Sequence, residues 1–152
     1  MTTQRTKDRR AVCGGRQTGI QNWAVYMAFA PMDKQFTLIK IGISEIPLRR
    51  IFEVHCGSPF PIKVALWQHV GFKNRALTAE AEILRDLSAY STRGEWLKME
   101  MKSAEHKKLF HDVSDKAIAR ATAQKPKWKK TTIPAIKEIL NINWDWLRNG
   151  YG

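Results

Sequence analysis

The chain has 152 residues, of which 43% are hydrophobic and 26% charged, so its composition is that of a globular domain rather than a disordered chain. This length fits one domain with short extensions. The sequence contains no run of about 18 apolar residues and no apolar leader, which argues against a membrane span and a secretory signal. Two cysteines, Cys13 and Cys56, cannot form a disulfide framework, so we expect a reducing, cytoplasmic setting.

The basic residues are distributed unevenly along the chain. The formal net charge is +12, to which residues 1–22 contribute +4, residues 23–97 only +2 and residues 98–152 +6. A nearly neutral body between basic flanks suits a protein that binds a polyanion, with nucleic acid as the first candidate. The same charge could serve solubility alone. The candidate nucleic-acid-binding residues are Arg9, Arg10, Arg16, Arg49, Lys125, Lys127, Trp128, Lys129 and Lys130.

Strand and helix patterns begin after residue 22. Runs of β-branched and aromatic residues predict strands, Pro47 marks a helix start, and Thr78 and Ser103 are expected to cap two further helices. In chain order we expect a flexible basic arm over 1–22, strands over 23–30 and 36–42, a helix over 48–55, a strand over 62–72, helices over 78–90 and 103–122, a basic linker over 124–130 and a small helical appendage over 132–147.

The first two strands predict a hairpin whose pairing can be estimated from its loop at residues 31–35. If that loop is symmetric, Lys40 lies directly opposite Tyr26, and the two side chains share a face of the sheet. The opposite face would then be apolar. It would carry Val25, Met27, Phe29, Ile39 and Ile41.

Several short motifs follow one another at characteristic intervals in the centre of the chain. They are Ala24-Val25-Tyr26, Lys40-Ile41-Gly42, Arg50, Cys56-Gly57-Ser58-Pro59, Ala79-Glu80 and Gly94-Glu95-Trp96. In this order and spacing, residues 23–98 resemble the GIY-YIG nuclease superfamily, and most closely its branch common in phages. The resemblance implies an α+β fold with a small three-stranded antiparallel sheet flanked by helices. The nuclease domain would then span 23–122, and residues 123–152 would form the linker and appendage.

The resemblance also implies a metal-dependent endonuclease that hydrolyses phosphodiester bonds in double-stranded DNA with one Mg²⁺ or Mn²⁺ ion. Tyr26 would activate water, aided by Lys40, whose charge would lower the pKa of a phenol that otherwise titrates near pH 10. Arg50 would bind the scissile phosphate through its planar fork. Glu95 would hold the metal, because one carboxylate with phosphate oxygens and water is an ordinary magnesium shell.

Two departures from the family pattern keep an alternative open. Many members carry His or Tyr one helical turn after the arginine, where this chain has Val54, which leaves the adjacent His55 as a lesser candidate base. A histidine common in the later helix is replaced by Leu84. The alternative is a catalytically inactive nucleic-acid-binding protein on the same fold, and an RNA-directed protein is a further rival.

The resemblance also implies a biological setting, and the sequence leaves two roles open for Trp128. The phage-type branch implies a phage or mobile element, and hence the cytoplasm of an infected bacterial host, without a membrane partner. Trp128, which lies among lysines, could stack on a base while the lysines contact phosphates, or it could pack its indole onto the body of the protein. Both alternatives stay open, as does the oligomeric state.

Overall fold

The computed structural model of the chain describes residues 22–94 and 96–140. The predicted arm, except Asn22, and residues 141–147 of the predicted appendage lie outside the described residues. In chain order the elements are β1 (Trp23–Pro31), β2 (Thr37–Ser44), α1 (Pro47–Gly57), β3 (Val64–Gly71), α2 (Lys73–Asp86), the 3-10 turn η1 (Ser88–Tyr90), β4 (Trp96–Met99), α3 (Ala104–Thr122), β5 (Lys129–Thr131) and α4 (Ile133–Leu140).

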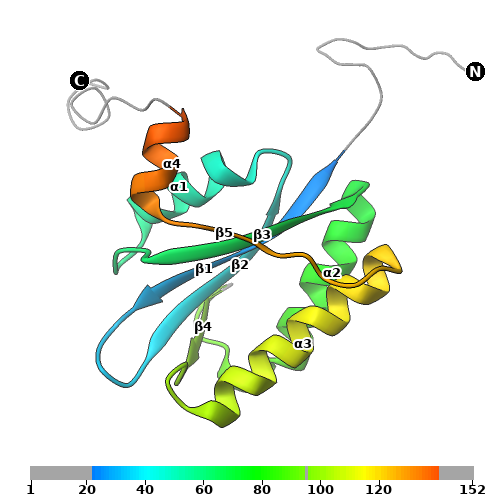
Figure 1. The fold of residues 1–152 in the computed structure, drawn as a ribbon. Helices are drawn as coiled ribbons and strands as arrows, with labels where there is room; N and C mark the ends of the chain where they lie inside the picture. The colour runs from blue at the N-terminus through cyan, green and yellow to red at the C-terminus, as the bar shows by residue number, and fades with distance from the viewer. Residues whose placement is uncertain (1–21, 95, 141–152) are drawn as a thin grey trace, which may run out of the picture.

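The strands form one antiparallel sheet in the order β4-β2-β1-β3-β5 (Figure 1). The α+β class is confirmed, but the predicted number of three strands is wrong. The three predicted strands form the centre of the sheet, and β4 and β5 extend it on either side. These two strands have only four and three residues, too few to show a period of two in the sequence. Residues 129 and 130, predicted as part of a linker, belong to β5.

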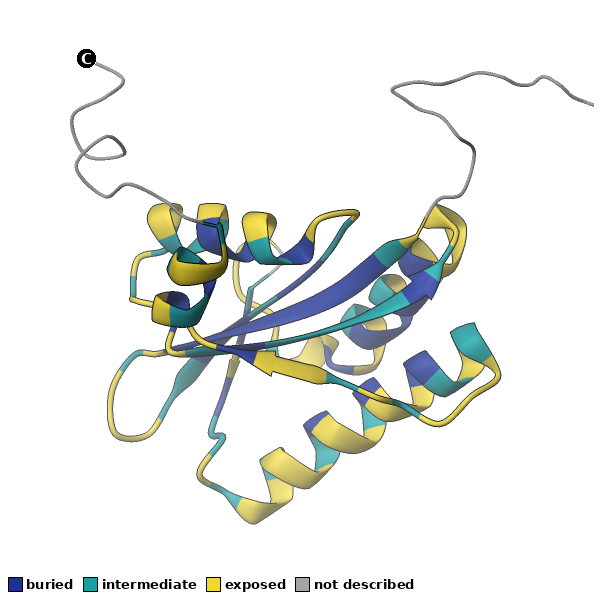
Figure 2. Cartoon of the chain, turned by 45° about the horizontal axis from the view of Figure 1, so that its top comes forward, coloured by how far each residue is buried: buried dark blue, intermediate teal, exposed yellow. Residues whose placement is uncertain are grey.

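Helices cover both faces of the sheet. On one face, α2 and α3 pack on an apolar cluster that includes the five residues predicted to line it, from Val25 to Ile41. On the other face, α1 and α4 pack on Tyr26, Ala28, Ala30 and Ala65. The helix pairs lie on opposite sides of the sheet in Figure 1, and in Figure 2 β1 is buried along most of its length. The assignment of the hairpin residues to the two faces is therefore confirmed.

The register of the hairpin differs from the predicted one by two residues. Tyr26 pairs with Gly42, and Lys40 pairs with Ala28. The reason lies in the loop, where the Asp33 carboxylate accepts hydrogen bonds from the backbone N–H groups of Gln35 (2.8 Å) and Phe36 (2.7 Å). This Asx-type turn moves the centre of the hairpin toward the second strand. A shift by two residues preserves the faces, because side chains alternate with a period of two.

The helix starts show one wrong and one confirmed prediction. The helix expected at Thr78 begins at Lys73, and the Thr78 hydroxyl instead donates to the Asn74 carbonyl inside the helix (2.8 Å). Ser103 does cap α3, since its hydroxyl accepts a hydrogen bond from the backbone N–H of His106 (3.4 Å). Among residues 22–94 and 96–140, no helix has both the length and the apolar character needed to cross a bilayer.

Candidate active site

Tyr26 lies on the central strand β1 and pairs with Gly42 of β2. A Cβ atom placed on Gly42 would lie 2.7 Å from Cε2 of the Tyr26 ring and closer still to its Cζ and hydroxyl oxygen. The ring thus occupies the space that a side chain at residue 42 would fill. Tyr26 is 1% exposed, so its environment is set by the protein rather than by bulk water.

Arg50 is the charged partner of Tyr26. It lies on α1, which covers the face of the sheet that carries Tyr26. The pKa of the Arg50 guanidinium is raised above its ordinary value, chiefly by electrostatic interaction with Tyr26 and further by hydrogen bonds with Tyr26 and Glu53. The Glu53 carboxylate accepts from Nη1 of Arg50 at 3.4 Å. Because the Arg50 side chain is 49% exposed, an incoming anion reaches Arg50 before it reaches Tyr26.

Lys40 lies on the same face as Tyr26 but not directly opposite it, so the predicted opposition is wrong. It pairs with Ala28 on one side and with Trp96 of β4 on the other. Diagonal neighbours on one face of a sheet have Cα atoms about 7–8 Å apart, within reach of a lysine side chain. Arg50 acts on Tyr26 through a hydrogen bond, and Lys40 lies in the neighbouring row of the same face.

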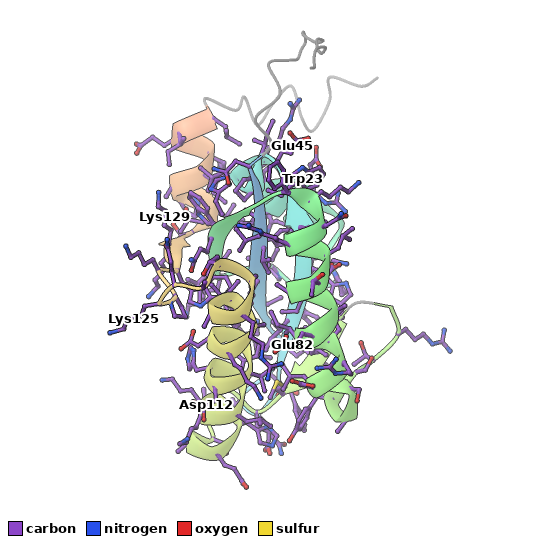
Figure 3. The ribbon with its side chains drawn as sticks, turned by 90° about the vertical axis from the view of Figure 1, so that its right-hand side faces the viewer. Trp23, Glu45, Glu82, Asp112, Lys125 and Lys129 are labelled. Carbon is purple, nitrogen blue, oxygen red and sulfur yellow. The ribbon has the colours of Figure 1, made fainter. Side chains whose placement is uncertain are left out.

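A cavity of about 330 Å³ opens beside Arg50, where β2 leads into α1. Glu45 and Trp23, which both line it, lie at the same end of the sheet in Figure 3. Two guanidinium and two carboxylate groups share this cavity, so it suits a polar, charged ligand. Its lining residues are Trp23, Ile43, Ser44, Glu45, Ile46, Arg49, Arg50 and Glu53.

The predicted metal ligand, Glu95, lies outside the described residues. Within 22–94 and 96–140, no three His, Cys, Asp or Glu side chains gather as a ready-made metal site. Glu45 and Glu53 are the carboxylates of the cavity, and Glu53 is paired with Arg50. Carboxylates are the side-chain ligands that Mg²⁺ takes, together with water and substrate phosphate oxygens.

Sequence reasoning missed two aromatic residues of β3 on the Tyr26 face. Trp67 pairs directly with Tyr26, and His69 follows two residues later, with ring centroids 5.4 Å apart in an edge-on arrangement. The pKa of His69 is lowered by burial and by the charge of Lys129, while a hydrogen bond with the Glu45 backbone opposes this shift. The spacing of two residues within a predicted strand was the available signal. The pairing partner of that strand was not evident from the sequence.

The basic residues between 125 and 130 make different contacts, and two of them lie on different faces of the sheet. Lys129 lies on the Tyr26 face, with its Nζ 5.0 Å from the centroid of the Trp67 ring, whereas Lys130 pairs with Leu66, whose side chain packs on the opposite face. The backbone N–H of Lys127 donates to the Gln68 side chain (2.7 Å), and Lys125 is exposed and labelled in Figure 3. Arg9, Arg10 and Arg16 lie outside the described residues.

Trp128 and His55 have structural partners. The indole N–H of Trp128 donates to the Asp115 carboxylate on α3 (2.9 Å), and its ring packs against the core. The packing role is thus present, and base stacking by Trp128 stays a prediction. Nδ1 of His55 accepts a hydrogen bond from the backbone N–H of Ile62 (3.1 Å), which ties the end of α1 to the loop before β3.

The two departures from the family pattern lie on different faces. Leu84 packs in the cluster beneath α2 and α3, on the side of the sheet away from Tyr26. Val54 packs in the cluster that contains Tyr26. The replacement at Leu84 therefore removes nothing from the immediate surroundings of Tyr26.

Comparison with known families assigns the chain. Residues 24–120 match the T5orf172 domain, and the chain belongs to this family. The T5orf172 domain is associated with phages and stands in the neighbourhood of the GIY-YIG and HNH-type nucleases. No curated protein and no solved structure gives a significant match. The matched residues contain the sheet core, Tyr26 and Arg50, so the candidate site lies within the family domain.

Proposed function

We propose that this protein is a metal-dependent endonuclease of GIY-YIG type that hydrolyses phosphodiester bonds in double-stranded DNA. The observation that carries the proposal is the pairing of Tyr26 with Arg50 over Gly42, at the positions where the motif order predicts the base and the phosphate-binding residue. Membership of the T5orf172 family supports a nucleic-acid-directed role.

In this proposal Arg50 has two partners in turn. In the free protein it hydrogen-bonds with Tyr26 and Glu53. A phosphodiester of the substrate would take up part of its five-donor fork, since its two non-bridging oxygens can accept two N–H groups of a guanidinium at once. The remaining interaction with Arg50 favours the phenolate form of Tyr26, because a nearby cation stabilises the charged form of an acid. Tyr26 can then accept the proton of an attacking water.

Lys40 and Glu95 complete the proposed site. Lys40, one row from Tyr26, adds positive charge to the surface on which the phosphate would lie. Glu95 is the proposed ligand of one Mg²⁺ or Mn²⁺ ion. When bound, such an ion supplies charge stabilisation at the phosphate and at the leaving oxygen.

The test is incubation of supercoiled plasmid with the purified full chain and Mg²⁺ or Mn²⁺, beside Glu95→Ala and Tyr26→Phe. We expect nicked or linear product from the wild-type protein only. Equal product from all three proteins would reject the assigned roles. Tyr26→Phe removes only the hydroxyl that Arg50 contacts, so retention of its folding is checked by circular dichroism.

The alternative, a catalytically inactive nucleic-acid-binding protein, is favoured by one observation. Tyr26 is 1% exposed, so a water molecule reaches its hydroxyl only when the neighbouring side chains move. DNA binding without cleavage on several substrates, with either metal ion, would establish this alternative.

A further inference from the structure

A single row of paired residues crosses four strands on the face that carries Tyr26. Gly42 of β2 pairs with Tyr26 of β1, Tyr26 pairs with Trp67 of β3, and Trp67 pairs with Lys129 of β5. Directly paired residues share a face of the sheet. The short edge strand β5 thus places Lys129 in line with the candidate base.

This row lies at the border of the surface that α1 and α4 cover. The next row contains Ala65, which is 1% exposed, and Thr131, which is buried. By contrast, Trp67 is half-buried and Lys129 is exposed. The end of the row at Lys129 is therefore accessible to a ligand, whereas Ala65 and Thr131 of the next row are buried beneath the helices.

The ammonium group of Lys129 is held in place by the ring of Trp67. It lies 5.0 Å from the centroid of the Trp67 ring, a cation–π arrangement that restricts a side chain with four rotatable bonds. Its charge also acts on the His69 ring, which places it toward the Tyr26 side. None of the carboxylates of the described residues forms an ion pair with Lys129.

We propose that Lys129, held by Trp67, binds a phosphate of the same DNA strand whose scissile phosphate lies at Arg50. This inference rests on the proposed function and adds to it the direction in which the DNA strand crosses the sheet, from β1 toward β5. Strands are about 4.8 Å apart, so Lys129 lies roughly 10 Å from Tyr26 along the row. At that distance Lys129 would meet a different phosphate of the strand from the one at Arg50.

The adjacent residue provides a matched control. Lys130 carries the same charge on the same strand, and it pairs with Leu66, which faces α2 and α3. Both lysines are exposed, so replacing either by alanine should leave folding intact. A general effect of net charge would make the two variants equal, whereas a contact on the Tyr26 face makes the loss larger for Lys129→Ala than for Lys130→Ala.

The experiment measures binding of the full chain to a fluorescein-labelled 20-base-pair DNA duplex by anisotropy, without divalent metal and over a range of salt concentrations. We expect Lys129→Ala to weaken binding roughly eightfold at 0.1 M salt and to reduce the slope of log K against log salt by about 0.9, the value for one phosphate contact. Lys130→Ala, on the opposite face, should reduce the slope less than Lys129→Ala does. Trp67→Leu should weaken binding in the same direction as Lys129→Ala, and Lys129→Arg should restore the slope.

Two results would overturn the inference: equal losses for the two lysine variants, or an unchanged slope for Lys129→Ala. Wild-type cleavage of plasmid is measured in parallel. Selective loss of binding in Lys129→Ala without any cleavage by the wild-type protein would refute the proposed nuclease but support the DNA contact. Cleavage by the wild-type protein, with equal DNA binding by Lys129→Ala and Lys130→Ala, would support the proposed nuclease but refute the DNA contact of Lys129.

Discussion

Gly42 of β2 lies directly opposite Tyr26 of β1, and the Tyr26 ring fills the space where a side chain of residue 42 would be. The hydroxyl at the end of that ring interacts with Arg50 from the helix above. The missing side chain of Gly42 thus determines where the ring of Tyr26 lies, and with it where the phenol meets the guanidinium.

Gly42→Ala should displace the Tyr26 ring and reduce cleavage. The added methyl group would lie within 3.0 Å of three atoms of the phenol, in the interior of the sheet. Overpacking of this kind costs about 1–3 kcal/mol of the free energy of unfolding. Urea unfolding measures that loss. Gly57→Ala is the control, because a Cβ atom at that position meets no atom within 4 Å, and its stability should match the wild type.

Arg50→Lys should lower kcat by about 100-fold or more, because lysine retains the charge but loses the planar fork. Arg49→Lys provides the comparison, since Arg49 lines the same cavity. Its substitution should raise KM by only a few fold, as expected for a contact that serves binding. Steady-state cleavage of a labelled duplex separates the two constants. Similar losses of kcat in both variants would contradict the specific role of Arg50.

His55 should make the protein less stable in mild acid. Burial, and to a lesser degree the charge of Lys137, lower the pKa of His55 below its ordinary value of 6.5. Because the folded state binds this proton less readily than the unfolded state, the contribution is fully present above pH 6.5 and is lost as the pH falls through the folded pKa. Protonation would also remove the acceptor that Ile62 uses.

Thermal unfolding between pH 8 and pH 5 tests this expectation. His55→Asn retains a side-chain acceptor near the position of Nδ1 but cannot titrate, so its melting temperature should fall less over this range. The pKa of His69 is lowered as well, so it contributes in the same direction. His69→Asn therefore accompanies the first variant. An unchanged pH profile in His55→Asn would show that the hydrogen bond to Ile62 does not control the acid response.

Trp128→Phe should reduce stability, and its effect on DNA affinity separates the packing role from base stacking. The substitution removes the hydrogen bond to Asp115 and part of the packing against α3, a loss of about 1 kcal/mol. Urea unfolding and the duplex anisotropy measurement are made on the same preparation. Weaker DNA binding at full stability would instead assign Trp128 to base stacking.

The sequence predicted the parts of this molecule that depend on local pattern. The hairpin faces, the helix start at Pro47 and the cap at Ser103 all follow from residues within a few positions of one another. The register of the hairpin was wrong because a hydrogen-bonded turn around Asp33, rather than the length of the loop, sets its centre. Side-chain alternation cannot detect an error of two residues.

The parts that were missed depend on pairing between distant segments. The edge strands β4 and β5 are short, and nothing in their own sequence identifies their partners. The meeting of Trp67 with Lys129 joins residues far apart in the chain. For the candidate site, the motif order named both Tyr26 and Arg50, but it did not predict their direct interaction, and the predicted register placed Lys40 opposite Tyr26 instead of one row away.

The shortness of β4 and β5 has a consequence for how this molecule behaves in a crowded solution. An edge strand with free backbone groups is a template on which another chain can add, and long, flat, apolar edges lead to aggregation. Here β4 carries Lys98, and β5 carries Lys129 and Lys130 within three residues. Each edge offers a second molecule few backbone hydrogen bonds and a repelling positive charge. Both features disfavour the addition of a strand from another chain.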